Sequence, residues 1–428
     1  MDITLAAGKA SGHIHIPASK SQTIRALLIA TMAGGTSVIR NPLYSADTEA
    51  CMKACGQFGA QLVHEEGKIT LSRTALPSKP FTVDCANSGT TLYLAVGLAA
   101  SAGVPVTFTG DNQLCARPVG ALLSSLADLG ATVLDADRKP NIPDTPPFTI
   151  IGPLQGGRTS IISTTSQYLS GLLLAALTST DTVHIDVPLL HEKPYVGITM
   201  SWLDKQGIQY TAAQDLSRFE VPGKQRFSPF DTYISGDFSS ASFFFCAAAI
   251  SGTAITVAGL DKDDPQGDKH ILDILEAMGC NIVWNGPAVT VTGPVGGRLK
   301  SGSFDLNTMP DALPVLAVTA CFADGRVILG NVPQARIKET DRIAVMYENL
   351  ASLGARIEER EDALVIEGGT SLTGGVVSGH GDHRIIMAMA IASLRCRTPL
   401  TIEGIDAVSV TFPTFFPLLS TLFTPEAL

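Results

Sequence analysis

Amphipathic stretches that end in glycine recur along the chain. In each case a small or apolar residue follows the glycine, and then a β-like run such as Gln61–Val63 or Asn281–Val283. The glycines are Gly59, Gly130, Gly207, Gly279 and Gly354, with spacings of 71, 77, 72 and 75 residues. Glycine just past a helix commonly adopts the left-handed conformation that caps it. The pattern predicts a helix followed by a strand about once in every 70 residues.

A second marker repeats at the same spacing. It is a cluster of Ser, Thr or Asp in front of a stretch rich in Ala and Leu, and these residue types are preferred at helix N-caps. The six openings are Ser21, Ser88-Gly89-Thr90, Thr165-Ser166-Gln167, Ser239-Ser240, Asp311 and Asp382-His383-Arg384.

Two markers with one period predict six α/β units of about 71 residues, grouped as two domains of three units. The expected joint is near Tyr233–Asp237, and a first strand, Ile3–Ile16, fits either half. Simple α/β alternation without a repeat is the alternative.

Composition limits the function classes. Apolar residues make up 45% of the chain and charged residues 16%, which excludes disorder. The longest apolar run, Phe243–Ile250, is far shorter than the ~18 residues of a spanning helix. Eight cysteines without a CxxC pair and a start without signal-peptide features favour the cytoplasm. A net charge of −10 argues against nucleic acid or an acidic membrane as a partner. His13 and His15 lack a third ligand, so no metal site is expected.

The basic residues gather near predicted helix starts, where free backbone N–H groups favour anions. They are Lys20, Arg25, Arg117, Arg336, Lys338, Arg342 and Arg384. The alternative for each is a surface cation paired with a nearby carboxylate. Lys338 and Arg342 are four residues apart, which on a predicted helix places two like charges on one face unless an anion lies between them.

Several segments resemble the signatures of the 5-enolpyruvylshikimate-3-phosphate synthase family. Ser19–Leu27 is similar to the first signature and Asn87–Thr91 to the second. The others follow in the family's order: Arg117-Pro118, Ser166-Gln167, Lys193-Pro194-Tyr195, Gly236–Ala241, Pro310-Asp311, Arg336–Arg342 and Asp382-His383-Arg384. The resemblance covers essentially the whole chain.

This resemblance implies a two-domain α/β fold of six βαβαββ units, with the active site in the interdomain cleft. The N-terminal domain would be residues 19–235, and the C-terminal domain residues 1–18 plus 236–428. The implied reaction, a step of aromatic amino acid biosynthesis, transfers the enolpyruvyl group of phosphoenolpyruvate to the 5-hydroxyl of shikimate 3-phosphate and releases phosphate. A cytoplasmic monomer without metal or organic cofactor is expected, with glyphosate binding at the phosphoenolpyruvate site.

The resemblance also assigns roles to individual residues. The implied catalytic residues are Asp311, Glu339, Lys20 and Lys338. The implied shikimate 3-phosphate ligands are Lys20, Ser21, Arg25, Thr165, Ser166, Gln167, Asp311, Gln334 and Lys338. The implied phosphoenolpyruvate ligands are Lys20, Asn87, Gly89, Arg117, Gln167, Arg342 and Arg384.

Some positions depart from the family's commonest form. Tyr93, Glu192 and Val410 stand where arginine, serine and lysine are usual, which makes the expected site about three charges more negative. Milder departures are Gly197 for aspartate, Gln334 for asparagine and Thr165 for serine. We expect weakened inhibition by glyphosate.

Two alternatives stay open at this point. One is a related transferase with another acceptor alcohol, and the other is a non-catalytic anion-binding protein, which would need neither Asp311 nor Glu339. The sister family that uses UDP-N-acetylglucosamine fits poorly, because Cys115 lies in the wrong register before Arg117.

Overall fold

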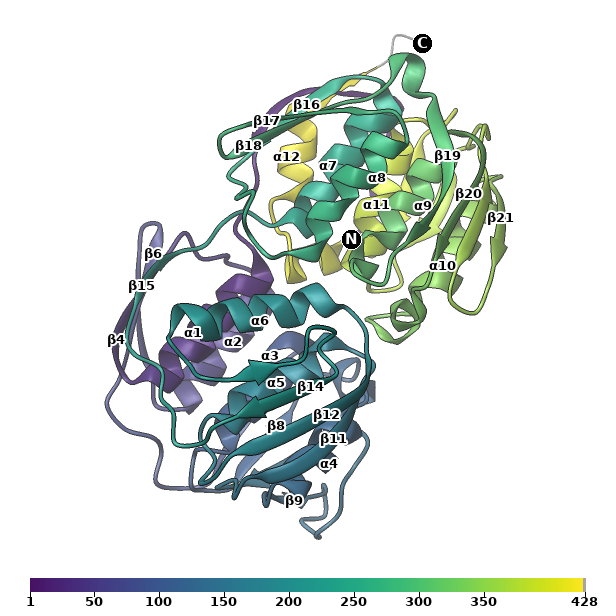
Figure 1. Ribbon diagram of the computed structural model, residues 1–428. Coiled ribbons are helices and arrows are strands. Elements are labelled where there is room, and N and C mark those ends of the chain that lie inside the picture. Colours follow the sequence, from purple (N-terminus) through teal and green to yellow (C-terminus); the bar gives the residue numbers. More distant parts are fainter. Residues whose placement is uncertain (426–428) are drawn as a thin grey trace. The chain divides into compact units, whose positions relative to one another are not determined.

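The chain divides into two compact units in the computed structural model, which describes residues 1–425 (Figure 1). The N-terminal unit is Ala18–Ile234, and the C-terminal unit combines Met1–Pro17 with Ser235–Leu428. Among residues 1–425, no helix combines the length and apolar character that a membrane crossing requires.

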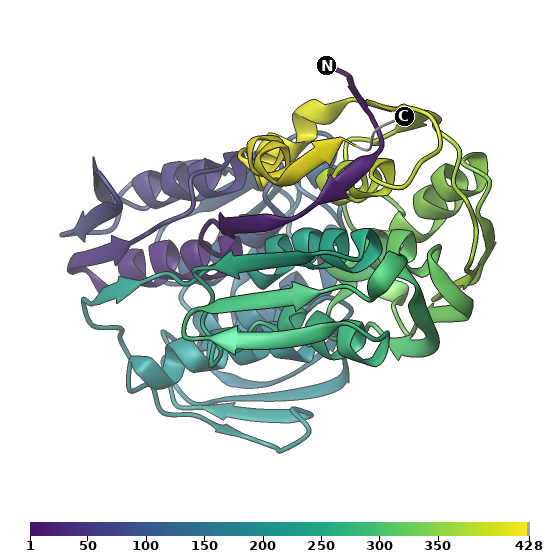
Figure 2. The same ribbon diagram turned by 90° about the horizontal axis from the view of Figure 1, so that it is seen from above.

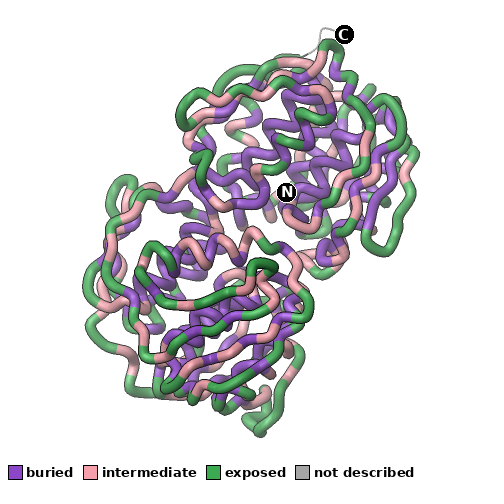
Figure 3. The backbone as a smooth tube through the Cα atoms, in the orientation of Figure 1, coloured by how far each residue is buried: buried purple, intermediate pink, exposed green. Residues whose placement is uncertain are grey.

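Each unit is built around three inner helices whose side chains are almost entirely buried (Figure 3). The inner helices are α1 (Lys20–Ala33), α3 (Gly89–Ala99), α5 (Ser166–Ala176), α7 (Phe238–Ser251), α9 (Leu313–Ala320) and α11 (His383–Ser393). Helices α3 and α5 approach closely because both carry glycine at the contact. A Cβ on Gly97 would lie 2.7 Å from the Gly171 carbonyl oxygen, and a Cβ on Gly171 would lie 2.1 Å from that of Tyr93.

A second helix follows in each of the six repeats. These outer helices are α2 (Ala46–Gln57), α4 (Gly120–Asp128), α6 (Lys193–Lys205), α8 (Ile271–Ala277), α10 (Arg342–Ser352) and α12 (Phe415–Leu422). The predicted glycine caps are confirmed, since the glycine just past each of the first five has a positive φ, between 68° and 101°. Only α12 ends without a glycine, running directly into a strand.

The sheets repeat one pattern. Around α3, α5, α9 and α11, the strand before the inner helix pairs in parallel with the strand after it, and further strands add antiparallel. The N-terminal unit has three sheets of four strands. The first has the order β15 (Asp231–Tyr233), β4 (Gly35–Arg40), β6 (Lys68–Arg73), β5 (Gln61–Glu65), and the second the order β7 (Phe81–Asp84), β8 (Val106–Thr109), β10 (Phe148–Ile151), β9 (Thr132–Leu134). The third has the order β11 (Gly157–Ser163), β12 (Val183–Leu190), β14 (Arg218–Val221), β13 (Thr211–Ala212).

The C-terminal unit repeats this arrangement. Its sheets are β17 (Asn281–Asn285)-β18 (Ala288–Thr292)-β16 (Ala254–Ala258)-β3 (Gly12–His15), β19 (Leu299–Asp305)-β20 (Ala323–Gly330)-β22 (Leu364–Glu367)-β21 (Arg356–Glu359), β1 (Ile3–Leu5)-β24 (Leu400–Glu403)-β23 (Gly375–Ser378) and the small pair β2 (Gly8–Ala10)-β25 (Phe423–Pro425). The prediction of a six-unit α/β fold is confirmed.

The start of the chain differs from the prediction of one strand over Ile3–Ile16. That segment forms three short strands, β1, β2 and β3, which pair with β24, β25 and β16. Gly12, directly after the second break, has a φ of +126°, which favours glycine, and Gly8 lets the ring of Phe423 approach, since a Cβ there would lie 2.5 Å from it. Figure 2 shows β3 beside β16.

The two strands that precede α1 and α7 exchange places between the units. Strand β3 runs into α1 but pairs with β16 of the C-terminal unit, and β15 runs into α7 but pairs with β4 of the N-terminal unit. The chain therefore passes between the units directly after each of these strands.

The inner helices of each unit begin at the same end. Tyr93 and Tyr168 lie in the early turns of α3 and α5, with their ring centroids 5.2 Å apart. Both hydroxyl groups donate to the carbonyl of Pro118. In the C-terminal unit the Arg384 guanidinium at the start of α11 donates to the carbonyl of Ser239 at the start of α7. Each unit thus gathers several helix N-termini, with their positive dipole ends, in one place.

Side chains cap five of the six inner helices. The caps are Ser19, Ser88, Thr165, Asp237 and Asp382. Two predicted openings, Ser21 and Ser239, are therefore wrong by two residues, because they lie inside the first turn. The fifth opening also differs: a 3₁₀ turn, Pro310–Ala312, precedes α9, and the side chain of Asp311 caps nothing.

Candidate active site

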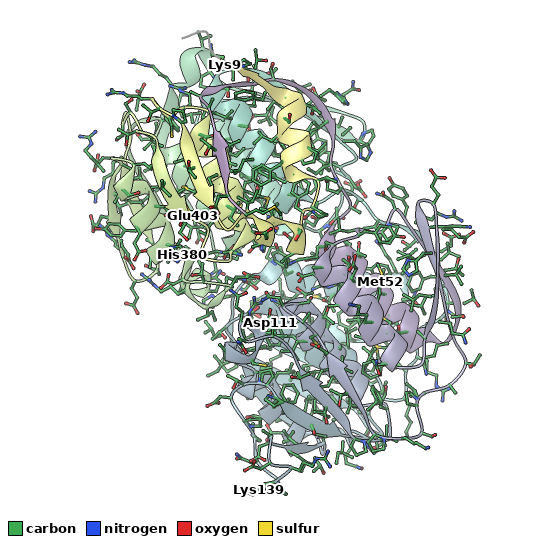
Figure 4. The ribbon with its side chains drawn as sticks, turned by 180° about the vertical axis from the view of Figure 1, so that it is seen from behind. Lys9, Met52, Asp111, Lys139, His380 and Glu403 are labelled. Atoms are coloured by element: carbon green, nitrogen blue, oxygen red, sulfur yellow. The ribbon has the colours of Figure 1, made fainter. Side chains whose placement is uncertain are left out.

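The predicted site residues of the N-terminal unit lie around the start of its inner helices. Lys20 and Ser21 are in the first turn of α1, Gly89 begins α3, and Ser166-Gln167 begins α5. Asn87, just before α3, donates to Asp111 at 2.7 Å. Figure 4 places Asp111, the partner of Asn87, and Lys139 at opposite ends of this unit.

Arg25 is a buried cation surrounded by neutral acceptors. Its guanidinium donates to the hydroxyl of Thr199 at 2.9 Å and to the carbonyls of Ser21 and Tyr195 at 3.0 Å each. None of these acceptors is charged, and burial lowers the pKa of Arg25 to about 10. A buried charge without a carboxylate is costly, so this geometry favours an incoming anion.

Glycine at position 89 leaves room for the guanidinium of Arg117, which a side chain there would have to displace. A Cβ on Gly89 would lie 2.7 Å from Nη1 of Arg117, and Nη2 donates to the side-chain oxygen of Asn87 at 3.2 Å. Arg117 and the backbone N–H groups at the start of α3 are donors of the kind that suit an anion. Lys20 is held differently, by an ion pair with Asp47 at 2.9 Å.

The start of α5 already binds a carboxylate of the chain itself. One oxygen of Glu192, Oε2, accepts from the Thr165 hydroxyl at 3.1 Å, the Ser166 backbone N–H at 3.1 Å and the Ser166 hydroxyl at 2.8 Å. Glu192 is 2% exposed. The sequence showed that Glu192 departs from the family's usual serine, but not that its side chain turns to these donors.

Two glutamines each offer an acceptor that no group in the described chain uses. Gln167 donates its amide N–H to Thr165 and Gln334 donates to the Asn307 carbonyl, while each side-chain oxygen is buried without a hydrogen-bond partner among residues 1–425. A buried acceptor without a donor is costly. Substrate hydroxyl groups are suitable donors for both atoms.

The C-terminal unit holds a cluster of carboxylates around one arginine. Arg342 is 1% exposed and donates to Asp311 at 2.7 Å, to Glu339 at 2.8 Å and to both oxygens of Asp382 at 2.7 and 3.3 Å. Arg384 lies 3.4 Å from the other oxygen of Asp311. The structure thus brings together two of the predicted catalytic residues and two predicted phosphoenolpyruvate ligands.

Burial and charge shift the pKa values of this cluster. Burial raises the pKa of Asp311, but Arg384, Arg342 and Lys338 outweigh it, and the pKa falls far below its ordinary value. Burial, assisted by Glu339, keeps the pKa of Asp382 above its ordinary value despite Arg342. Burial lowers the pKa of Arg342, yet its three carboxylates raise it well above the ordinary value. Asp311 is therefore a carboxylate at neutral pH.

The expectation that Lys338 and Arg342 share a helix face is wrong. Helix α10 begins only at Arg342, because Asp341 caps it by accepting from the next two free N–H groups, those of Ile343 and Ala344. Lys338 lies in irregular chain after the 3₁₀ turn Pro333–Ile337. Its positive charge instead acts on Asp311.

Arg336 fits the surface-cation alternative. Its guanidinium pairs with Asp341 at 2.6 Å and with Glu359 at 2.9 Å and is a quarter exposed. Tyr93, in place of the usual arginine, supports the segment after Arg117 through its bond to Pro118 at 3.0 Å. Val410 is half-buried at the end of a 3₁₀ turn that begins at Ile405.

Sequence reasoning missed two partners of the site. Asp47 is 27 residues from Lys20, and no local pattern links them. Asp382 was recognised only as a helix opening, although it also binds Arg342; its place beside Arg384 in a specific motif was the available signal. Asp311, Gln334, Lys338, Glu339, Arg342 and Arg384 belong to the C-terminal unit, and the other candidate residues to the N-terminal unit.

Comparisons with known proteins identify the family. The family model described as EPSP synthase (3-phosphoshikimate 1-carboxyvinyltransferase) matches residues 6–419. Curated proteins named 3-phosphoshikimate 1-carboxyvinyltransferase include one from Acetivibrio thermocellus, 44% identical over 415 residues (96% of each chain). Another, from Ruminiclostridium cellulolyticum, is 43% identical over 407 residues, 95% of this chain and 94% of that protein.

A solved structure of EPSP synthase from Acinetobacter baumannii superposes with a TM-score of 0.81 at 25% identity, covering 99% of this chain and 98% of that one. The family match and the curated relatives both extend over nearly the whole chain. This chain therefore belongs to the EPSP synthase family.

Proposed function

We propose that this enzyme transfers the enolpyruvyl group of phosphoenolpyruvate to the 5-hydroxyl of shikimate 3-phosphate and releases phosphate, using residues from both units. The observation that carries the residue assignment is the buried Arg342, which holds Asp311 and Glu339 side by side on neighbouring nitrogens. A protein that only bound anions would need the cations but neither of these carboxylates.

Binding of shikimate 3-phosphate rests on buried polar groups of the N-terminal unit. Arg25 offers a charge without a carboxylate partner, and Lys20, which is paired with Asp47, supplies a second positive charge. Gln167, and Gln334 of the C-terminal unit, offer acceptors for the ring hydroxyl groups. Ser21, Thr165 and Ser166 supply hydroxyl and backbone donors around the helix starts.

Binding of phosphoenolpyruvate requires an exchange of partners at Arg342. The protein's own carboxylates already accept four of its five N–H groups. When the substrate carboxylate takes a share of Arg342 and Arg384, the positive charge that acts on Asp311 decreases, and the lowered pKa of Asp311 rises. The substrate thereby makes Asp311 a better base.

The reaction then moves one proton off the acceptor and one onto the donor. Asp311 takes the proton of the 5-hydroxyl group while the oxygen of that hydroxyl group bonds to C2 of phosphoenolpyruvate. At the same time Glu339 or Lys20 delivers a proton to the methylene carbon. The cationic character at C2 in the transition state is stabilised by the nearby carboxylates. Loss of phosphate and of one methyl proton regenerates the double bond. Asn87, Gly89, Arg117 and Lys338 orient the two anions.

The test is phosphate release from phosphoenolpyruvate by the purified chain with shikimate 3-phosphate, with shikimate, and with no acceptor. We expect release that depends on shikimate 3-phosphate. The variant Asp311→Asn keeps the shape but not the base, and should lower kcat by about 10²–10⁴-fold with a small change in KM. If phosphate is released with neither shikimate 3-phosphate nor shikimate, the acceptor must be another alcohol. An Asp311→Asn variant that keeps its activity would exclude Asp311 as the base.

We also propose that the enzyme acts as a cytoplasmic monomer on these two small anions, with no nucleic acid or membrane partner. Sedimentation equilibrium over a range of concentrations tests the oligomeric state, and a single species at about twice the chain mass would contradict it. Fractionation of the source cells tests the location.

A further inference from the structure

The start of helix α5 is an anion site with its own occupant. Three donors, two hydroxyl groups and one backbone N–H, converge on a single oxygen of Glu192. Helix α5 is eleven residues long, so its N-terminus carries the partial positive charge that favours an anion. The carboxylate takes the place that an oxygen of a phosphate group would take.

The backbone at Glu192 is strained into this arrangement. Its φ of 56° and ψ of 40° lie in the left-handed region, which is unfavourable for a glutamate. Glu192 lies two residues past β12, after His191. In four other repeats the residue directly after the corresponding strand has a positive φ, and it is asparagine or glycine: Asn41, Gly259, Asn331 and Gly404. Glu192 makes no side-chain cap on its own helix α6, and its Oε2 accepts the three donors at the start of α5.

We propose that Glu192 is a resident anion that competes with the phosphate group of the acceptor for Thr165 and Ser166, and so sets the enzyme's affinity for phosphorylated acceptors. This inference rests on the proposed function, which places shikimate 3-phosphate at these two residues. Two anions cannot share the same three donors, so the phosphate must displace the carboxylate. Part of the phosphate's binding free energy is then used in that displacement.

The competition predicts a selective effect on one substrate. Glu192→Ser removes the carboxylate and supplies a small neutral hydroxyl, leaving the donors to the phosphate. We expect KM for shikimate 3-phosphate to fall by about tenfold or more, the scale of one charge-assisted hydrogen bond. KM for shikimate, which lacks the phosphate, and KM for phosphoenolpyruvate should change by less than about twofold. Glu192→Gln, which keeps an oxygen but not the charge, should give an intermediate decrease.

The matched control is Glu66→Gln. Glu66 is exposed in the turn between β5 and β6 of the same unit, so this variant removes one negative charge away from α5. Its KM for shikimate 3-phosphate should equal that of the wild type. An equal decrease in this control would mean that net charge, and not occupancy of the α5 site, governs affinity.

Direct binding of inorganic phosphate, measured by titration calorimetry on the full chain, separates this proposal from the reaction itself. We expect phosphate to bind Glu192→Ser more tightly than the wild type and to raise its thermal midpoint more. If neither the wild type nor the variants catalyse enolpyruvyl transfer, but inorganic phosphate binds more tightly to Glu192→Ser than to the wild type, the proposed reaction is wrong and the role of Glu192 stands. Unchanged phosphate binding and unchanged KM for shikimate 3-phosphate in both folded Glu192 variants would overturn the role of Glu192.

Discussion

Replacement of Arg342 by methionine tests whether one arginine stabilises the carboxylate cluster. Methionine has a similar length and no charge, so Arg342→Met removes the partner of Asp311, Glu339 and Asp382 without leaving a large cavity. Asp311 and Glu339 are 22% and 14% exposed and can regain some water, whereas Asp382 is 0% exposed and cannot. The expected loss of stability therefore comes mainly from Asp382.

The magnitude has an upper limit that depends on pH. Breaking a buried ion pair by removing one partner costs about 3–5 kcal/mol. Asp382 can avoid burying its charge by keeping its proton. Holding that proton above the ordinary pKa of 3.8 costs 1.36 kcal/mol for each pH unit, which is about 4 kcal/mol at pH 7 and about 2 kcal/mol at pH 5. We expect Arg342→Met to lower the free energy of unfolding by about 4 kcal/mol at pH 7 and by less than half of that at pH 5.

The direction of the pH dependence follows from the two states. In the wild type, the lowered pKa of Asp311 gives stability that is present above pH 3.8 and is lost as the pH falls further. In the variant, the pKa of Asp382 is raised further, so its penalty is absent below its unfolded pKa and grows as the pH rises toward the folded one. The difference between the two proteins must therefore increase from pH 5 to pH 7.

The chain provides a separate fluorescent reporter for each unit. Of its two tryptophans, Trp202 lies on α6 of the N-terminal unit and Trp284 on β17 of the C-terminal unit. Urea unfolding in a Trp202→Phe background reports the C-terminal unit, and unfolding in a Trp284→Phe background reports the N-terminal one. The loss should be confined to the signal of Trp284.

The control for this measurement is Arg326→Met. Arg326 is half exposed on β20 and lies 3.8 and 3.5 Å from Glu358 and Glu367, so its loss should cost about 1 kcal/mol or less at either pH. An Arg342→Met penalty that is as small as this, or one that is the same at pH 5 and pH 7, would refute the reasoning about Asp382.

Two further predictions concern the ligand sites. Arg25→Met should raise KM for shikimate 3-phosphate by about tenfold or more. The free energy of unfolding, followed through the fluorescence of Trp202, should fall by less than about 2 kcal/mol, because the buried guanidinium has neutral acceptors and no carboxylate is left without a partner. A large loss of stability would show that Arg25 is structural. Because Tyr93 and Val410 replace cations, the inhibition constant of glyphosate should exceed KM for phosphoenolpyruvate, in competition assays with saturating shikimate 3-phosphate; a constant at or below that KM would contradict this.

The repeat and the family could be predicted from the sequence because their signals are local. Glycine past a helix end needs a positive φ whatever the rest of the fold does, and Gly59, Gly130 and their three counterparts all have one. The family assignment, now confirmed by the comparisons, depended on short segments whose order along the chain is itself visible. The same local rule located Ser88, Thr165 and Asp382 as caps.

Partners distant in sequence could not be predicted in this way. Asp311 looks like one more helix cap, and only the 3₁₀ turn before α9 shows that its side chain binds Arg342 instead. The Lys338–Arg342 spacing suggested a helix, but the Asp341 cap starts that helix four residues later. In both cases the residue at which the helix starts decides whether a polar side chain caps the helix or enters the site. Intrinsic helix propensity determines that starting residue poorly.

The two units solve one physical problem in the same way. A place built to hold a substrate anion gathers positive charge or N–H donors, and leaving these unsatisfied in a buried setting is unfavourable. In the N-terminal unit Glu192 fills the start of α5, and in the C-terminal unit Asp311 and Glu339 fill the donors of Arg342. Arg25 differs, because its three acceptors are neutral, and burial lowers its pKa. Under the proposed function, substrate binding at these two places is an exchange of anions, so we expect changes to the resident carboxylates to alter affinity as strongly as changes to the cations.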